Sequence, residues 1–92
     1  GLGTKHFFDG MLRFALPNEP KVRGQVEDIM KGSLKTFILI TMREVDGGAR
    51  LDVAYQIRLR ATKPAAEILT ELSKIEGISD VQFMMQDATT EM

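Results

Sequence analysis

The amino-acid sequence predicts an α+β domain in which four strands and two helices follow one another in the order β-α-β-β-α-β. The first observation is a central hairpin over residues 36–60, whose second arm alternates apolar and polar side chains. The second is a segment with helical spacing of apolar residues on each side of this hairpin. The third is a strand pattern at the outer end of each helical segment. A four-stranded antiparallel sheet with both helices on one face satisfies this order.

The composition is that of one ordinary globular domain, with 92 residues, 43% hydrophobic and 27% charged. The 12 basic and 13 acidic residues nearly balance. This argues against a dedicated nucleic-acid-binding domain, because affinity for phosphates needs a basic surface. The chain has no cysteine, which excludes disulfides, thiolate metal ligands and cysteine nucleophiles. Its single histidine, His6, is expected to be a solvated surface residue.

The sequence predicts less order at the two ends of the chain than in its middle. We expect residues 1–5 to form a flexible lead, residues 6–86 a single domain and residues 87–92 a disordered tail. The longest strongly apolar run, Phe37 to Ile40, is far shorter than the ~20 residues of a membrane-spanning helix. No signal peptide is visible. Because the chain starts at Gly1 and not at Met, we expect it to be a piece of a longer polypeptide.

The first strand is predicted from Phe8 to Leu16, where apolar and polar residues alternate. Gly10 either weakens this strand or marks a bulge. The sequence Pro17-Asn18-Glu19-Pro20 ends it, with Asn18 predicted as the N-cap of a helix and Pro20 suited to its first turn. Gly32 is predicted to end this helix in a left-handed turn. Four apolar residues form its buried stripe: Val22, Val26, Ile29 and Met30.

The hairpin is predicted from the strand Thr36–Val45, the turn Asp46–Gly48 and the strand Arg50–Arg60. Aspartate and glycine tolerate the positive φ angles that a tight turn needs. The inner face of the second arm is apolar: Leu51, Val53, Tyr55, Ile57 and Leu59.

The second half repeats the first, with Thr62-Lys63-Pro64 at the start of a helix and Gly77 at its end. The last strand is predicted over Ile78–Gln86, with Val81, Phe83 and Met85 on one side. The whole arrangement is ferredoxin-like. The buried stripe of the second helix is again apolar: Ala65, Ile68, Leu69, Leu72 and Ile75.

In this topology the second strand lies at an edge of the sheet and carries apolar residues on both faces. An exposed apolar edge favours aggregation, so proteins normally cover it. Two explanations remain open: another subunit or another part of a longer chain covers it, or a loop or the tail shields one face. We predict a homo-oligomer through this edge, since apolar patches mark interfaces. The predicted interface residues are Phe37, Ile38, Ile40 and Met42, and Met84 and Met85 are candidates at the opposite edge.

The helix-free face is predicted to be charged, and its central strands offer no aromatic residue to stack on bases. Nucleic acid is therefore not an expected partner. The carboxylate pairs Glu44 with Asp46 and Glu67 with Glu71 show no sign of burial, and the sequence has no phosphate-binding loop and no metal-ligand spacing. We expect a protein without catalytic residues, metal or cofactor. The expected residues of the open face are Asp9, Arg13, Asp52, Gln56, Arg58 and Arg60.

From Leu51 to Arg60, and again from Ile68 to Val81, the sequence resembles ACT and ACT-like domains. The stretch Tyr55–Arg60 is particularly similar to the cytoplasmic C-terminal domains of MgtC/SapB-type bacterial membrane proteins. The matching positions around the second helix and last strand are Leu72, Ile75, Gly77, Ile78 and Val81.

The resemblance implies a non-catalytic regulatory or assembly domain that acts by self-association. It also implies a transmembrane domain in the same polypeptide and a place at the cytoplasmic face of the bacterial inner membrane. In amino-acid-binding ACT domains the loop after the first strand meets the ligand. Here that loop is Leu16–Pro20, which makes Asn18 and Glu19 candidate ligand-binding residues, although the family's glycine is absent. The alternative is a freestanding ACT-type amino-acid sensor that regulates a metabolic enzyme.

Overall fold

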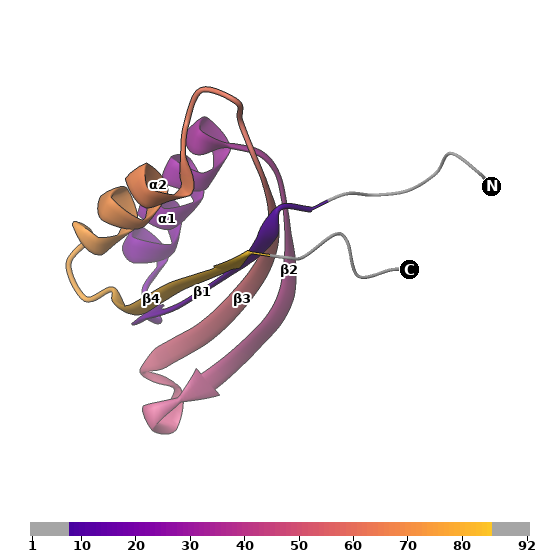
Figure 1. Cartoon of the computed structure of the whole chain (residues 1–92). Helices are drawn as coiled ribbons and strands as arrows, with labels where there is room; N and C mark the ends of the chain where they lie inside the picture. The colour runs from indigo at the N-terminus through magenta and orange to yellow at the C-terminus, as the bar shows by residue number, and fades with distance from the viewer. Residues whose placement is uncertain (1–7, 86–92) are drawn as a thin grey trace, which may run out of the picture.

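The computed structural model describes residues 8–85, which form a sheet covered on one face by two helices (Figure 1). The strands pair antiparallel in the order β2-β3-β1-β4, so the predicted ferredoxin-like fold is confirmed. The predicted lead at 1–5, His6 and the tail at 87–92 lie outside the described residues. In chain order the elements are β1 (Gly10–Pro17), α1 (Pro20–Ser33), β2 (Leu34–Val45), the 3₁₀ turn η1 (Asp46–Gly48), β3 (Arg50–Leu59), α2 (Ala65–Ser73) and β4 (Ser79–Met85).

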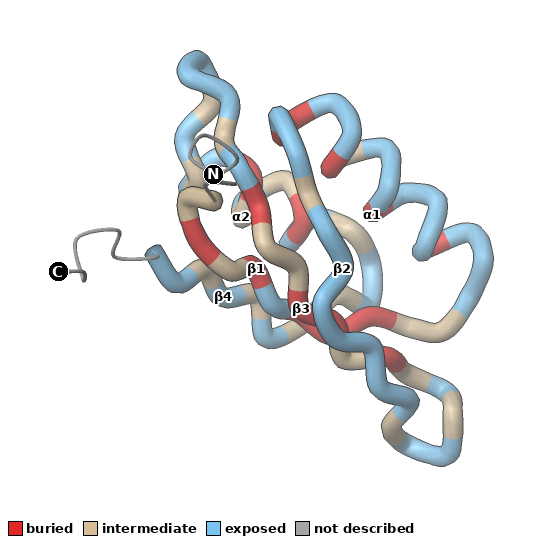
Figure 2. Tube along the Cα trace, turned by 90° about the vertical axis from the view of Figure 1, so that its right-hand side faces the viewer, coloured by how far each residue is buried: buried red, intermediate tan, exposed pale blue. Residues whose placement is uncertain are grey.

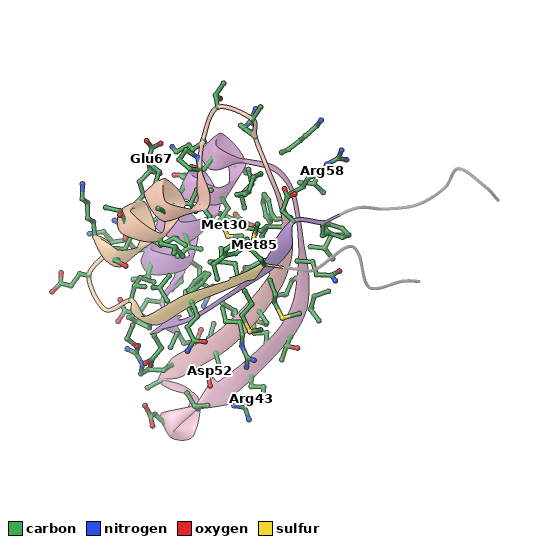
Figure 3. All side chains as sticks on the ribbon, in the orientation of Figure 1. Met30, Arg43, Asp52, Arg58, Glu67 and Met85 are labelled. Atoms are coloured by element: carbon green, nitrogen blue, oxygen red, sulfur yellow. The ribbon has the colours of Figure 1, made fainter. Side chains whose placement is uncertain are left out.

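The hydrophobic core fills the space between the two helices and the inner face of the sheet. Figure 3 shows Met30 between these layers, whereas Arg58 and Glu67 extend outward on opposite sides of the molecule. The apolar faces of β1 and β3 and the apolar stripes of both helices pack together in this core. The two-residue spacing predicted for the strands and the helical spacing predicted for the helices are therefore confirmed. The buried cluster consists of Leu12, Phe14, Leu16, Val22, Val26, Met30, Leu34, Leu51, Val53, Ile57, Ile68 and Leu72.

Three aromatic rings connect the strands on the helix-covered face. Tyr55 of β3 lies stacked beside Phe14 of β1, with ring centroids 6.0 Å apart, and meets Phe37 of β2 edge-on, also at 6.0 Å. Such pairs add to the burial of apolar area. Burial raises the pKa of the Tyr55 hydroxyl, and the negative charge of Glu27 on α1 raises it further. The aromatic rings therefore serve the core, as the sequence pattern indicated.

The predicted helix cap at Asn18 is wrong. Glu19 holds the N-cap position, with φ −132° and ψ 136°, and makes no side-chain cap hydrogen bond. Asn18 instead donates its side-chain Nδ2 to the carbonyl of Gly48 at 2.9 Å, and its backbone N–H to Ala49 at 2.9 Å. The side chain that would have made a local cap is thus used in a long-range hydrogen bond to Gly48.

The predicted left-handed stop at Gly32 is also wrong. The helix α1 continues through Gly32 to Ser33, and the chain turns at Leu34 with φ −112° and ψ 149°. The Leu34 N–H donates to the Met30 carbonyl, so the last turn closes without a glycine. Because Leu34 is also a buried core residue, β2 starts there, two residues before the predicted strand.

The helix α2 ends at Ser73, four residues before the predicted stop at Gly77. Two tight turns follow, in which Ile75 donates its N–H to Leu72 and Ile78 donates to Ile75. Gly77 lies in the second turn with φ +91°, so its predicted left-handed conformation is confirmed. These turns reverse the chain within a short distance, which a longer helix would prevent.

The turn of the hairpin has three successive residues with positive φ: Asp46 at 52°, Gly47 at 67° and Gly48 at 95°. This confirms the turn predicted from Asp-Gly-Gly. A further positive φ of 56° lies at Asp80, where β4 has one residue more than β1 between their paired positions. Aspartate is among the residues that tolerate this conformation, and the result is a β-bulge.

A polar clamp holds α2 against the end of α1. The Glu71 carboxylate binds the Lys63 ammonium at 2.7 Å and accepts a hydrogen bond from the Ser33 hydroxyl at 3.2 Å. The hydrogen bond from Lys63 contributes most to lowering the pKa of Glu71. Glu71 was predicted to be a solvated carboxylate beside Glu67, and the structure assigns it to this clamp instead.

We expect Glu71→Gln to weaken the acid sensitivity of folding. A carboxylate whose pKa is lower in the folded state stabilises the fold above its unfolded pKa of about 4.3 and loses this effect as pH falls through the folded pKa. Urea midpoints from about pH 7 down to about pH 3 should therefore fall less steeply for Glu71→Gln than for the parent. Glu67→Gln is the matched control on the same helix. If the urea midpoint of Glu67→Gln also fell as little toward acid pH as that of Glu71→Gln, the assignment would be contradicted.

Candidate functional site

The outer edge of β2 is the most distinctive surface of the described chain. Figure 2 shows this strand exposed along most of its length. Among residues 8–85 its backbone pairs only with β3, so within this range one row of its peptide groups has no neighbouring strand. Four large apolar side chains are exposed there: Ile38 at 46%, Leu39 at 46%, Ile40 at 49% and Met42 at 56%. Phe37, the other predicted interface residue, is half-buried against the core.

A bulge at Ile40 explains why this strand has apolar side chains on both faces. Leu39 pairs with Tyr55 and Thr41 with Ala54, so Ile40 has no counterpart in β3. From Thr36 to Leu39 the odd-numbered residues face the helices, and from Thr41 onward the even-numbered residues do, because the side chains of a regular strand alternate. Leu39 and Met42 therefore share the helix-covered face.

A groove of about 330 Å³ lies between α1 and the hairpin, beside this edge. Tyr55 and Met42 line it from the sheet, and Pro20 and Gly24 line it from the helix. Gly24 has no heavy atom within 4 Å of the position of an added Cβ, so the helix side of the groove is open. Met42 belongs both to the exposed apolar residues of β2 and to the lining of this groove.

The predicted ligand-binding residues Asn18 and Glu19 have different surroundings in the structure. Both polar atoms of the Asn18 side chain are engaged, since its Oδ1 also accepts a hydrogen bond from Arg23 at 2.5 Å. Glu19 lines a shallow depression of about 770 Å³ between α1 and α2, together with Asp28 and Lys74. Of the predicted pair, only Glu19 is placed to meet a ligand there.

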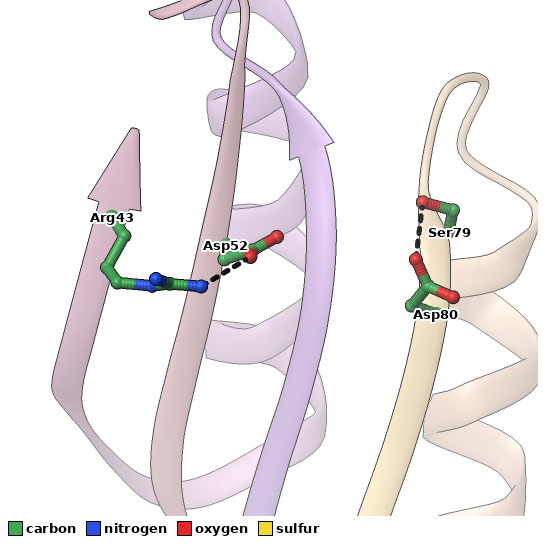
Figure 4. Close-up of polar contacts among 4 residues, drawn as sticks. All are labelled: Arg43, Asp52, Ser79 and Asp80. Atoms are coloured by element: carbon green, nitrogen blue, oxygen red, sulfur yellow. Dashed lines mark hydrogen bonds and ion pairs between the residues drawn. The ribbon is translucent and has the colours of Figure 1, made fainter. Parts of the chain in front are cut away.

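The helix-free face carries a second shallow basin of about 380 Å³. Ala15 and Ala54 lie at its base, each only 5% exposed, and Arg13 borders it. Figure 4 shows the Arg43–Asp52 ion pair of this region, with 3.1 Å between nitrogen and oxygen. Exposed pairs of this kind contribute about 0–1 kcal/mol, so the pair adds little to stability. Figure 4 also shows the Ser79 hydroxyl donating to Asp80 beside the bulge of β4.

Two further properties concern residues 8–85. Within this range no three His, Cys, Asp or Glu side chains gather as a metal-ligand group. None of the helices described here is long and apolar enough to cross a membrane.

No protein-family model matches the chain, and no curated protein matches it in sequence. Among solved structures, the chain is similar to the ACT domain of the GTP pyrophosphokinase of Chlorobium tepidum. The TM-score is 0.60, and the alignment covers 84% of this chain and 97% of that domain at 15% identity. The fold is ACT-like. The predicted resemblance is thus confirmed for the fold, whereas its MgtC/SapB part stays a prediction.

In this ACT-like fold, sequence reasoning missed two features of the site. The bulge at Ile40 has no glycine or proline to signal it, and it becomes visible only when β2 is paired with β3. The hydrogen bond between Asn18 and Gly48 joins residues 30 positions apart, so it could not be predicted from the local sequence.

Proposed function

We propose that this ACT-like domain is a non-catalytic regulatory or assembly domain that acts by self-association through β2. The observation that carries the proposal is the group of exposed apolar side chains between Ile38 and Met42, on an edge that no other strand of the described part of the chain pairs with. Covering such an edge removes apolar area from water and satisfies backbone groups at the same time. The similar structure from Chlorobium tepidum is a domain of a larger enzyme, which supports an accessory role for this fold.

Lysine at Ile38 or Ile40 should weaken self-association by about tenfold or more, because a twofold dimer buries the new charge twice. The measurement is sedimentation velocity over a concentration series of the parent and each variant. Thr70→Lys is the control, since Thr70 is exposed on α2 and its hydroxyl donates to the Ala66 carbonyl in the same helix. Met84→Lys, at the opposite edge of the sheet, tests whether β4 associates instead. A parent protein that is monomeric at every concentration would contradict the proposal.

A second function is favoured by the depression beside Glu19: an ACT-type amino-acid sensor that regulates a metabolic enzyme. A ligand that binds only the folded state adds RT ln(1 + [L]/Kd) to the free energy of unfolding. Thermal melts in the presence of each amino acid would therefore reveal a ligand as a rise in Tm. Glu19→Gln should reduce that rise if Glu19 contacts the ligand amine. Melts that no amino acid changes would argue against this function.

The proposed setting is the cytoplasmic face of a bacterial inner membrane, in one polypeptide with a transmembrane domain. Its support is the similarity of Tyr55–Arg60 to the MgtC/SapB-type domains. The test is fractionation of the full gene product in bacterial cells. A product that pellets with membranes and needs detergent to dissolve would support this setting, and one that stays in solution would overturn it.

A further inference from the structure

We infer that β2 pairs with β2 of a second copy in one antiparallel register, with Leu39 at the twofold axis and Lys35 beside Glu44. This rests on the self-association proposed above and adds the residues that select the partner. A second copy is the partner because the charges and apolar residues of this strand are complementary to the strand itself. Lys35 lies near its start and Glu44 near its end, with the exposed apolar residues between them.

The bulge at Ile40 limits the registers that such a pair can adopt. Residues that oppose one another across antiparallel strands lie on the same face of the sheet. A twofold axis perpendicular to the sheet places one residue opposite its own copy and equally distant residues opposite each other. Ile40 has no counterpart in β3, so the positions on either side of the axis are numbered without Ile40. A shift by one residue would set helix-facing side chains against outward-facing ones, so only shifts by two compete.

With Leu39 on the axis, apolar residues meet on both faces. Phe37 and Met42 oppose each other across the dimer, and both lie on the helix-covered face, since their partners in β3 are Ile57 and Val53. On the helix-free face Ile38 opposes Thr41, whose partners in β3 are Gln56 and Ala54. The two Leu39 side chains meet at the centre, with Ile40 of each copy next to them. These last two side chains are each about half exposed in the single chain, at 46% and 49%.

The charges at the ends of the strand decide between the competing registers. Lys35 and Glu44 are exposed, and among the ion pairs of residues 8–85 neither takes part in one. Lys35 lies at a second irregularity, between Leu34, which pairs with Leu59, and Thr36, which pairs with Arg58. Leu34 is buried, so Lys35 is the side chain available to a partner at this end of the strand. An axis at Thr41 would set Glu44 against Phe37. An axis at Ile38 would set Lys35 against Met42, and only the Leu39 axis brings Glu44 beside a lysine.

Charge reversal tests this register. Lys35→Glu and Glu44→Lys should each weaken the dimer about three- to tenfold at low salt, because each change places like charges together at both ends. The double variant should restore the parent dissociation constant, since it exchanges the two charges. Sedimentation velocity of the four proteins gives the values. Arg58→Glu, a charge reversal on the open face of β3, is the control and should leave the constant unchanged.

Cysteine pairing gives a second readout, because the chain has no cysteine of its own. Opposed antiparallel residues have Cα atoms about 4.5–5.5 Å apart, which suits a disulfide. Mixed Ile38→Cys and Thr41→Cys chains should cross-link on oxidation, whereas Ile38→Cys with Arg43→Cys, the pair of the Thr41 axis, should not. A parent that dimerises while the double charge variant stays weakened, or while the control pair cross-links preferentially, overturns the register alone. A parent that stays monomeric overturns both proposals.

Discussion

Replacing Gly77 with valine is expected to lower the free energy of unfolding by at least about 2 kcal/mol. Gly77 has a φ of +91°, which β-branched residues rarely adopt. A Cβ at this position would lie 2.5 Å from Cγ and 2.9 Å from Cδ of Pro17, which is too close for carbon atoms. Gly77 also presents its carbonyl to Arg50 at 2.9 Å, so any local shift would disturb that hydrogen bond. Urea unfolding of parent and variant measures the change.

Three further variants separate the causes and provide a control. Pro17→Ala combined with Gly77→Ala should recover part of the stability lost in Gly77→Ala alone, because it removes Cγ and Cδ of Pro17 but leaves the backbone strain. Gly24→Ala should stabilise the fold by about 0.5–1 kcal/mol, since Gly24 lies inside α1 and an added Cβ meets no heavy atom within 4 Å. A Gly77→Val variant that melts with the parent would refute the left-handed assignment.

Truncation of Leu72 to alanine should cost about 2–5 kcal/mol of unfolding free energy. Leu72 has no exposed surface and belongs to the core cluster under α2. Its removal would leave a cavity between this helix and the sheet. Because domains of this size have total stabilities of about 5–15 kcal/mol, the variant is expected to be unfolded at moderate urea concentrations where the parent is folded.

Leu69→Ala on the same helix is the matched control for Leu72→Ala. Leu69 is only partly buried at the edge of the core, so its truncation removes less buried area and should cost clearly less. Urea midpoints with unchanged m values would show that both differences are differences in stability. Equal losses at the two positions would contradict the burial that distinguishes them.

The parts of the fold that the sequence predicted well are those specified locally. The hairpin combines an alternating strand with Asp46, Gly47 and Gly48, so period and turn chemistry agree. The ends of the helices were predicted less well, because distant contacts determine them. Gly32 was predicted to end the helix because glycine is common at helix ends. In the structure the helix continues past Gly32, and the chain passes directly into a strand at Leu34, which is buried in the core.

For the candidate site, the sequence predicted which strand is the edge but not its detailed geometry. The exposed residues Ile38 and Ile40 were identified from topology and hydrophobicity, and the structure confirms their exposure. At Ile40 the side chains that face the helices change from odd-numbered to even-numbered residues. This change could not be predicted, since it depends on the register with β3. Gly10 was interpreted as a weak point or bulge. Its actual role is close approach, because a Cβ there would collide with the Phe83 ring and the Met84 carbonyl.

The position of β1 has a consequence for how the domain is made. This strand is the first in the chain, yet it lies inside the sheet, between β3 and β4. While the protein is being synthesised, one side of β1 must wait for the last strand, Ser79–Met85, to leave the ribosome. The β2–β3 hairpin can close earlier from neighbouring residues, whereas the β1–β4 pairing has a large loop to close. A nascent chain therefore exposes two open strand edges, that of β1 and that of β2, and both are open to premature pairing between polysomal neighbours.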